Sequence, residues 1–119
     1  MMTVSKSLHD NIEVIESGYE YLLAYAAQGR ESDEAPGGSE VRTTLTSMSD
    51  AAGEIATSLD GNGSDFSSVV IDDAKKAGAA IALVLTQAKI SSELVDNLNA
   101  SIHLRALLTD LFLLSETAI

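Results

Sequence analysis

The chain has 119 residues, of which 18 are Asp or Glu and 7 are Lys or Arg, so its formal net charge at pH 7 is -11. This length suits a single domain with a substantial buried core. The absence of cysteine excludes disulfides, zinc ribbons, iron–sulfur clusters and thiol nucleophiles. The acidity argues against a nucleic-acid partner, because affinity for a phosphate backbone comes from Lys and Arg.

Two features of the sequence argue against a membrane location. The first residues lack the apolar stretch of a secretory signal. The longest apolar run, Ala77 to Leu85, has nine residues, whereas a helix needs about 20 to span a bilayer. We therefore expect a cytoplasmic protein with no membrane partner.

Apolar side chains recur every three or four residues, which is typical of amphipathic helices. The first series follows Ser7, which forms a variant of the capping box with Asp10, and Gly29 marks its end. The second begins after Ser39 as N-cap and ends at the turn 60–63. The two series are Leu8, Ile12, Ile15, Tyr19, Leu22 and Ala26, then Val41, Leu45, Met48, Ala52, Ile55 and Leu59.

The segment between these two series, residues 30–38, reads RESDEAPGG and contains the only proline. Proline and a Gly-Gly pair interrupt regular structure, so this segment is predicted to be a polar loop. We expect its acidic residues, Glu31, Asp33 and Glu34, to be solvated.

Two more series fill the rest of the chain. They are Phe66, Val70, Ala74, Ala77, Ile81, Val84 and Ala88, preceded by Ser64 as N-cap, then Asn97, Ala100, Leu104, Leu107, Leu111, Leu114 and Ala118. Because no Gly or Pro follows Gly78, the boundary between these helices must use Ser or Asn. We place it at Ser91-Ser92, with Asn97–Asn99 as the alternative. No β-like alternation competes, so the sequence predicts an all-α fold, an up-down-up-down four-helix bundle.

The apolar residues form stripes wider than one small bundle needs, which favours self-association, most simply as a homodimer. Residues 77–85 and 111–114 are apolar nearly all round, and such helices are buried on more than one side. A second stripe on the first helix, Val14, Gly18, Tyr21 and Tyr25, is a candidate interaction surface, since Tyr is favoured at interfaces. The alternative is a wide core-facing stripe with Tyr at its rim.

Tests for metal and cofactor sites give no candidate. The di-iron pattern Glu-x-x-His is absent, because neither His9 nor His103 has a Glu three residues before it. A haem between the two His fails because they lie toward opposite ends of an antiparallel pair. The loop Asp60–Asp65 has half of an EF-hand pattern, but Asp65 stands where glycine is needed and Ile71 where Glu is needed. We predict no cofactor, no metal and no catalytic residue.

The remaining function classes are three. We favour a non-enzymatic protein–protein interaction module (an adaptor, chaperone or assembly factor) that acts as a homo-oligomer and docks a partner helix or a basic protein surface. A phosphotransfer-type signalling bundle with one exposed His is an alternative, although His103 is followed by Leu104-Arg105-Ala106 and lacks the glycine expected there. An acidic inhibitor that mimics nucleic acid is another, and it needs carboxylates concentrated on one surface.

Overall fold

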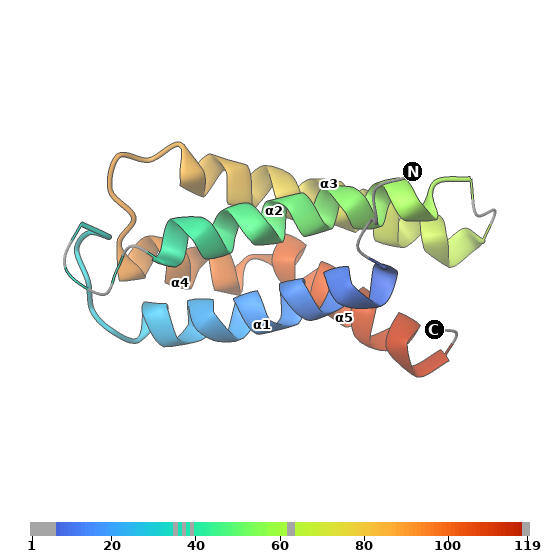
Figure 1. Ribbon diagram of the computed structural model, residues 1–119, viewed down its shortest axis with the longest axis horizontal. Helices are drawn as coiled ribbons and strands as arrows, with labels where there is room; N and C mark the ends of the chain where they lie inside the picture. Colours follow the sequence, from blue (N-terminus) through green and yellow to red (C-terminus); the bar gives the residue numbers. More distant parts are fainter. Residues whose placement is uncertain (1–6, 35, 37, 39, 62–63, 118–119) are drawn as a thin grey trace, which may run out of the picture.

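The computed structural model describes residues 7–34, 36, 38, 40–61 and 64–117, and it contains five helices (Figure 1). They are α1 (Leu8–Ala26), α2 (Glu40–Leu59), α3 (Asp65–Leu85), α4 (Ser92–Ala100) and α5 (Ile102–Thr117). The described residues contain no strand, which confirms the all-α prediction. None of the described helices combines the length and the apolar character that crossing a membrane requires.

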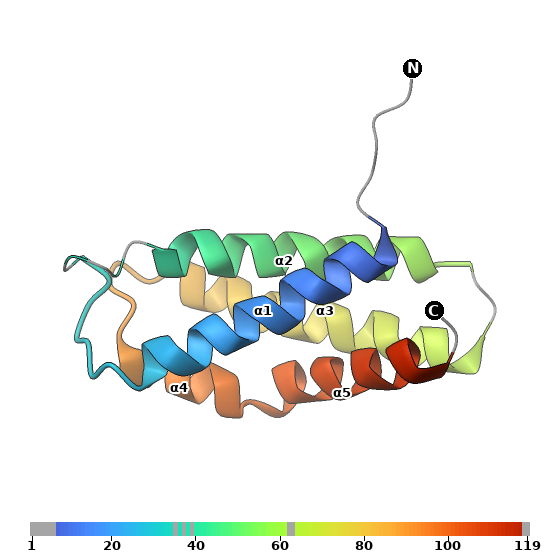
Figure 2. The same ribbon diagram turned by 60° about the horizontal axis from the view of Figure 1, so that its bottom comes forward.

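The helices form one compact body in which α2 lies between α1 and α3 and packs against both. Helices α4 and α5 follow one another along the remaining side, α4 chiefly against α1 and α5 chiefly against α3 (Figures 1 and 2). The chain directions of α3 and α5 are opposite, as the colour gradient of Figure 1 shows.

The structure has one helix more than predicted, because the last predicted helix is broken once, at Ser101. The break before it coincides with the predicted boundary. Ser91 accepts a hydrogen bond from the Leu94 backbone N–H at 3.0 Å and begins α4, whereas α3 already ends at Leu85. The second break is at Ser101, whose extended backbone leaves the helix and whose hydroxyl accepts from the Leu104 N–H at 3.3 Å. A serine hydroxyl that caps a new helix competes with continuation of the old one.

The boundary predicted at Ser91-Ser92 therefore marks the start of a helix, and the alternative at Asn97–Asn99 is wrong because both Asn residues lie inside α4. The predicted capping box of α1 is present: Ser7 and Asp10 each accept a hydrogen bond from the other's backbone N–H. Ser64 precedes α3 as expected, but its side chain makes no capping hydrogen bond. Ser39 lies outside the described residues.

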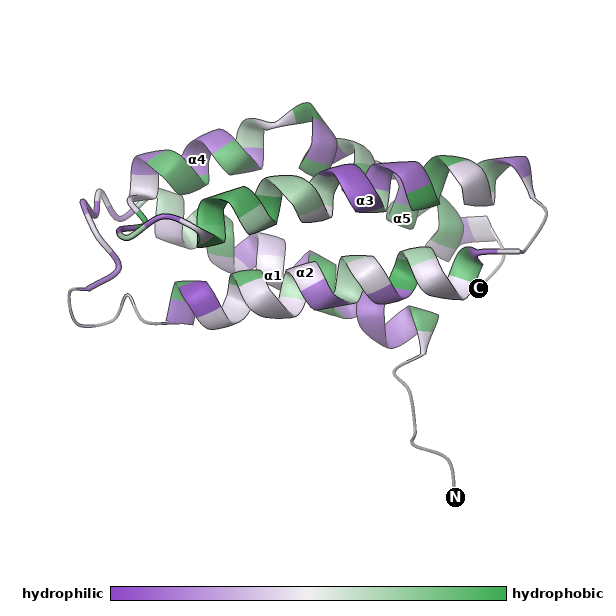
Figure 3. Ribbon diagram, turned by 90° about the horizontal axis from the view of Figure 1, so that it is seen from above, coloured by the Kyte–Doolittle hydropathy of each residue, from purple (hydrophilic) through white to green (hydrophobic). Residues whose placement is uncertain are grey.

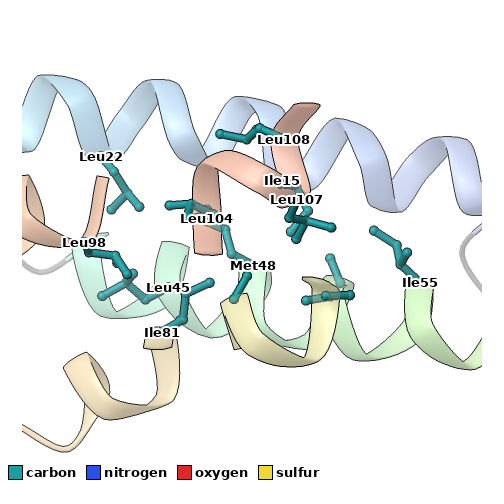
Figure 4. Packing of buried hydrophobic residues seen from close by; sticks show 14 of the residues in the cluster. Ile15, Leu22, Leu45, Met48, Ile55, Ile81, Leu98, Leu104, Leu107 and Leu108 are labelled. Atoms are coloured by element: carbon teal, nitrogen blue, oxygen red, sulfur yellow. The ribbon is translucent and has the colours of Figure 1, made fainter. Parts of the chain in front are cut away.

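The predicted apolar series supply the core, in which side chains from all five helices meet (Figure 4). In α2 the prediction is complete, since every member of the series is buried. In the fourth series the members before the Ser101 break, Asn97 and Ala100, are exposed. The series members that are buried are Ile12, Ile15, Leu22, Val41, Leu45, Met48, Ala52, Ile55, Leu59, Val70, Ala74, Ala77, Ile81, Val84, Leu104, Leu107 and Leu111.

Helices α1 and α2 approach each other most closely where Gly18 faces Met48. A Cβ atom added at Gly18 would lie 2.5 Å from Met48 Cγ and 2.6 Å from Sδ. These atoms belong to a fully buried side chain, so they have little room to move. Glycine at this position is therefore a packing requirement of the α1–α2 interface.

We expect Gly18→Ala to destabilise the fold, because overpacking costs about 1–3 kcal/mol, whereas replacing a helical glycine with alanine gains at most about 1 kcal/mol. Gly53→Ala is the matched control. Gly53 also lies inside a helix, but a Cβ there meets nothing within 4 Å, so only the gain remains. Urea unfolding of both variants measures the two changes. Equal stabilisation by both would show that the close contact at Gly18 is wrong.

Candidate functional site

The structure divides the predicted interaction stripe of α1 between the core and the surface. Gly18 and Tyr25 are buried, whereas Val14 and Tyr21 are half-buried. Gly18 still lines a shallow concavity with Val14, Tyr21 and residues of α2. The Tyr25 hydroxyl donates to the Ile90 carbonyl oxygen at 2.7 Å. A contact role for this stripe remains a prediction.

The prediction that Glu31, Asp33 and Glu34 are all solvated is wrong for Asp33, which is buried. Its carboxylate accepts from Arg42 Nε of α2 at 2.6 Å and from the Ile90 backbone N–H at 2.9 Å. The hydrogen bond from Arg42 holds the pKa of Asp33 below the ordinary carboxyl value, against the opposing effect of burial. One carboxylate thus joins the loop after α1 to α2 and to the segment before α4.

Arg42 reaches further and closes the carbonyl end of α3. Its guanidinium donates to the backbone oxygens of Leu85, Gln87 and Ala88 at 3.4, 2.9 and 3.1 Å. A helix C-terminus leaves carbonyl groups without intrahelical partners and carries partial negative charge, so a planar cation with five donors suits it. A weak sequence signal for this role is that Arg42 interrupts an otherwise uncharged stretch from Val41 to Ser49.

Ser92 completes the network at this end of the molecule. Its hydroxyl accepts from the Arg30 N–H at 2.8 Å and donates to the Tyr25 carbonyl at 2.7 Å, and its own N–H donates to the Arg30 carbonyl at 2.8 Å. We call Tyr25, Asp33, Arg42, Ile90 and Ser92 the loop clasp. The side chains of Tyr25, Asp33, Arg42 and Ser92, and the backbone of Ile90, are hydrogen-bonded within the chain, so the loop clasp has a structural role.

A second polar feature lies where α3 meets α5. Asp110 is only 7% exposed, its Oδ2 atom has no hydrogen-bond partner in the described part of the chain, and its carboxyl interacts with that of Asp73. Burial first, and then the hydrogen bond and negative charge of Asp73, raise the pKa of Asp110 to about 7. Asp110 is the one acidic residue within the apolar segment 106–114, and sequence reasoning overlooked it.

Two buried amides lie on the inner faces of α1 and α4. Asn11 donates to Glu54 of α2 at 3.1 Å, while its oxygen has no partner among the described residues. Asn99 is 5% exposed, and neither its nitrogen nor its oxygen is hydrogen-bonded within the described residues. A buried amide without partners destabilises the state that contains it.

The two histidines are exposed, and neither belongs to a metal site. His9 lies 4.0 Å from Glu13 on the outer face of α1, and His103 lies on the first turn of α5. In the described ranges, no three His, Asp or Glu side chains form a group that could hold a metal ion. Asn62 and Gly63 of the loop tested for calcium lie outside the described residues, and Asp60, Ser64 and Asp65 are exposed.

Exposed apolar side chains concentrate on α3 and α5. In Figure 3 the end of α3 nearest α4 is hydrophobic, and the segment 72–76 is hydrophilic. We call Val69 and Leu83 of α3, with Ile102 and Leu113 of α5, the α3–α5 surface. Leu83 is 66% exposed and Ile102 is 74% exposed, values typical of polar residues.

The contact between Asp73 and Asp110 fixes the arrangement of the α3–α5 surface. Leu113 lies one turn after Asp110 and Val69 one turn before Asp73, so in antiparallel helices both lie on the same side of the carboxyl pair. Leu83 and Ile102 lie on the other side by the same reasoning. Val69 and Leu83 are 14 positions apart in α3, and Ile102 and Leu113 are 11 positions apart in α5. Each spacing is close to a whole number of helical turns, so each pair lies on one face of its helix.

No protein-family model, curated protein or solved structure matches this chain. The geometry of the described residues is therefore the basis for its functional assignment.

We expect Asp33→Asn to lower the free energy of unfolding by about 1–3 kcal/mol, because the Arg42 hydrogen bonds lose their charged acceptor. Since the pKa of Asp33 is lowered in the folded chain, its stabilisation is present above the ordinary value of 3.8 and is lost as the pH falls through the lowered pKa. Glu34→Gln, an exposed neighbour, should leave stability unchanged. Urea unfolding at pH 7 and pH 3 tests both variants. An equal loss at the two pH values would contradict the ion pair.

Proposed function

We propose that this protein is a non-enzymatic helical interaction module that acts as a homodimer through the α3–α5 surface. The observation that carries the proposal is the exposure of large apolar side chains in line on two packed helices. Removing one such side chain from water contributes about 1.5–3 kcal/mol. Exposed apolar patches of this kind, bordered by polar residues, mark interaction sites in soluble proteins.

A second copy of the chain is the occupant that this surface suits best. Its two apolar pairs, Val69 with Leu113 and Leu83 with Ile102, flank a central carboxyl pair. A twofold axis through the centre would place the first pair of one copy against the second pair of the other, which is the self-complementarity that a symmetric dimer needs. The charged neighbours on α3, Asp72 and Lys76, form an ion pair at 3.1 Å and so add no net charge to the interface.

The proposal includes the arrangement of the helices within one chain. We infer that α4 and α5 together occupy the position of a fourth helix, so that the chain is an up-down-up-down bundle with a broken last member. The break at Ser101 turns Ile102 outward at the first position of α5, where it is 74% exposed. The broken helix thereby contributes the most exposed residue of the α3–α5 surface.

Phosphotransfer through His103 is the second candidate, because that side chain is exposed. An imidazole must be accessible to accept a phosphoryl group. Incubation with a small phosphoramidate donor followed by intact-mass measurement tests it, with His103→Gln as the control. No added phosphoryl group on the wild-type chain would exclude this candidate.

The self-association test compares variants of the α3–α5 surface with a matched variant elsewhere. We expect the wild-type chain to have twice the mass of one copy in light scattering coupled to size exclusion. The double variant Leu83→Gln with Ile102→Gln should shift the dissociation constant at least tenfold toward the single chain, because two apolar contacts are lost.

Leu23→Gln is the control, because Leu23 is also exposed but lies on α1, which shares no contact with α3. It should leave the mass of the dimer unchanged. A single-chain mass for the wild-type protein over the micromolar range, or an equal effect of the control, would overturn the proposal.

A further inference from the structure

The Asp73–Asp110 pair places two carboxyl groups in the contact that holds α5 to the rest of the chain. Helix α5 makes its largest contact with α3, and Asp110 lies within that contact with one oxygen lacking a partner in the described residues. Two adjacent carboxylates repel when both are ionised, whereas a proton between them makes one a hydrogen-bond donor to the other.

We propose that the Asp73–Asp110 pair is a proton-dependent latch, in which a shared proton keeps α5 docked on α3 and its loss lets α5 move away as a unit about Ser101. This device works within one chain and does not require self-association.

No cation of the described residues contributes to the pKa shift of Asp110, although Arg105 lines the same surface concavity as Asp110. Asp73 is the one described charged group that shifts the pKa of Asp110. On α3, the adjacent Asp72 and Lys76 are exposed and bonded to each other. The remaining titratable or charged groups on the helices that contact α5, and on α5 itself, are Asp65 and Lys75 of α3, His9, Asp10, Glu13, Glu16, Tyr19, Glu20, Tyr21 and Tyr25 of α1, Glu93 and Asp96 of α4, and His103, Arg105 and Glu116 of α5.

The break at Ser101 allows α5 to move without unwinding α4. Ser101 alone separates the two helices, and its backbone is extended, with φ -65° and ψ 141°. Residues at the ends of helices commonly absorb the change of angle in a hinge. Movement of α5 would expose Leu104, Leu107 and Leu111, which are fully buried in the docked state.

The direction of the pH effect follows from the two states of Asp110. In the docked state its pKa is about 7, whereas a solvated aspartate has the ordinary value of 3.8. Between pH 3.8 and about pH 7, opening therefore releases a proton from Asp110. The opening equilibrium should increase about tenfold for each pH unit from about 4 to 7 and should then level off, because above pH 7 both states are ionised.

Hydrogen exchange tests the latch on the full chain between pH 4.5 and 8.5. After correction for the intrinsic exchange rate, protection of α5 amides should fall with pH more steeply than that of α2 amides. Asp110→Asn keeps the shape of the protonated side chain and should remove the excess slope. Asp73→Asn is a second variant, which removes the like charge beside Asp110 and should reduce the excess pH slope of α5 protection. Asp72→Asn, the exposed neighbour, should retain the wild-type slope.

The mass of the protein is measured at each pH in the same samples. An α5 slope without a change of mass supports the latch, whether or not the chain self-associates. A slope shared equally by α2 and α5, or one that persists in Asp110→Asn, would overturn it. A slope that appears only together with a change of mass would overturn the latch and leave the self-association proposal standing.

Discussion

The arrangement of the helices depends most on the hydrogen bonds that the Asp33 carboxylate accepts. The carboxylate is bound at once by Arg42 of α2 and by the Ile90 N–H before α4, while it belongs to the loop after α1. Three segments distant in sequence are thereby fixed at one end of the molecule. Because the Asp33 carboxylate is buried, loss of Arg42 leaves an uncompensated charge. Loss of the carboxylate leaves the Arg42 and Ile90 donors unpaired. Both changes destabilise the fold. The apolar core stabilises the helices, but the loop clasp determines where their ends lie.

Polar groups without hydrogen-bond partners are found mainly where α4 and α5 meet the rest of the chain. Asn99 of α4 and Asp110 of α5 are both buried in this way, whereas the α2–α3 interface contains none among the described residues. The same side of the molecule has the helix break at Ser101 and the most exposed apolar residues. Segments that open locally tend to have such weaker packing. We therefore expect local opening to begin near the α4–α5 junction rather than within α1–α3.

Sequence periodicity predicted the helical fold and most of the core, because burial of an apolar stripe leaves a regular pattern. Every member of the α2 series from Val41 to Leu59 is buried, as expected. The pattern did not detect the break at Ser101, since Leu104 continues the spacing of Asn97 and Ala100 across it. Nor did it identify Asp33 or Asp110 as buried, because a charged residue reveals its partner only when the chain has folded. Arg42 lies nine positions from Asp33, but the Ile90 N–H that shares its carboxylate lies 57 positions away, and no local pattern predicts that contact.

The close approach of Gly18 and Met48 has a chemical consequence. A Cβ at Gly18 would lie 2.6 Å from Met48 Sδ, so the side of the sulfur that faces Gly18 has no room for a sulfoxide oxygen. In the folded chain the thioether is sealed between two helices and is protected from oxidants. We expect a sulfoxide formed at Met48 in an unfolded chain to weaken the packing of α1 against α2 when the chain folds.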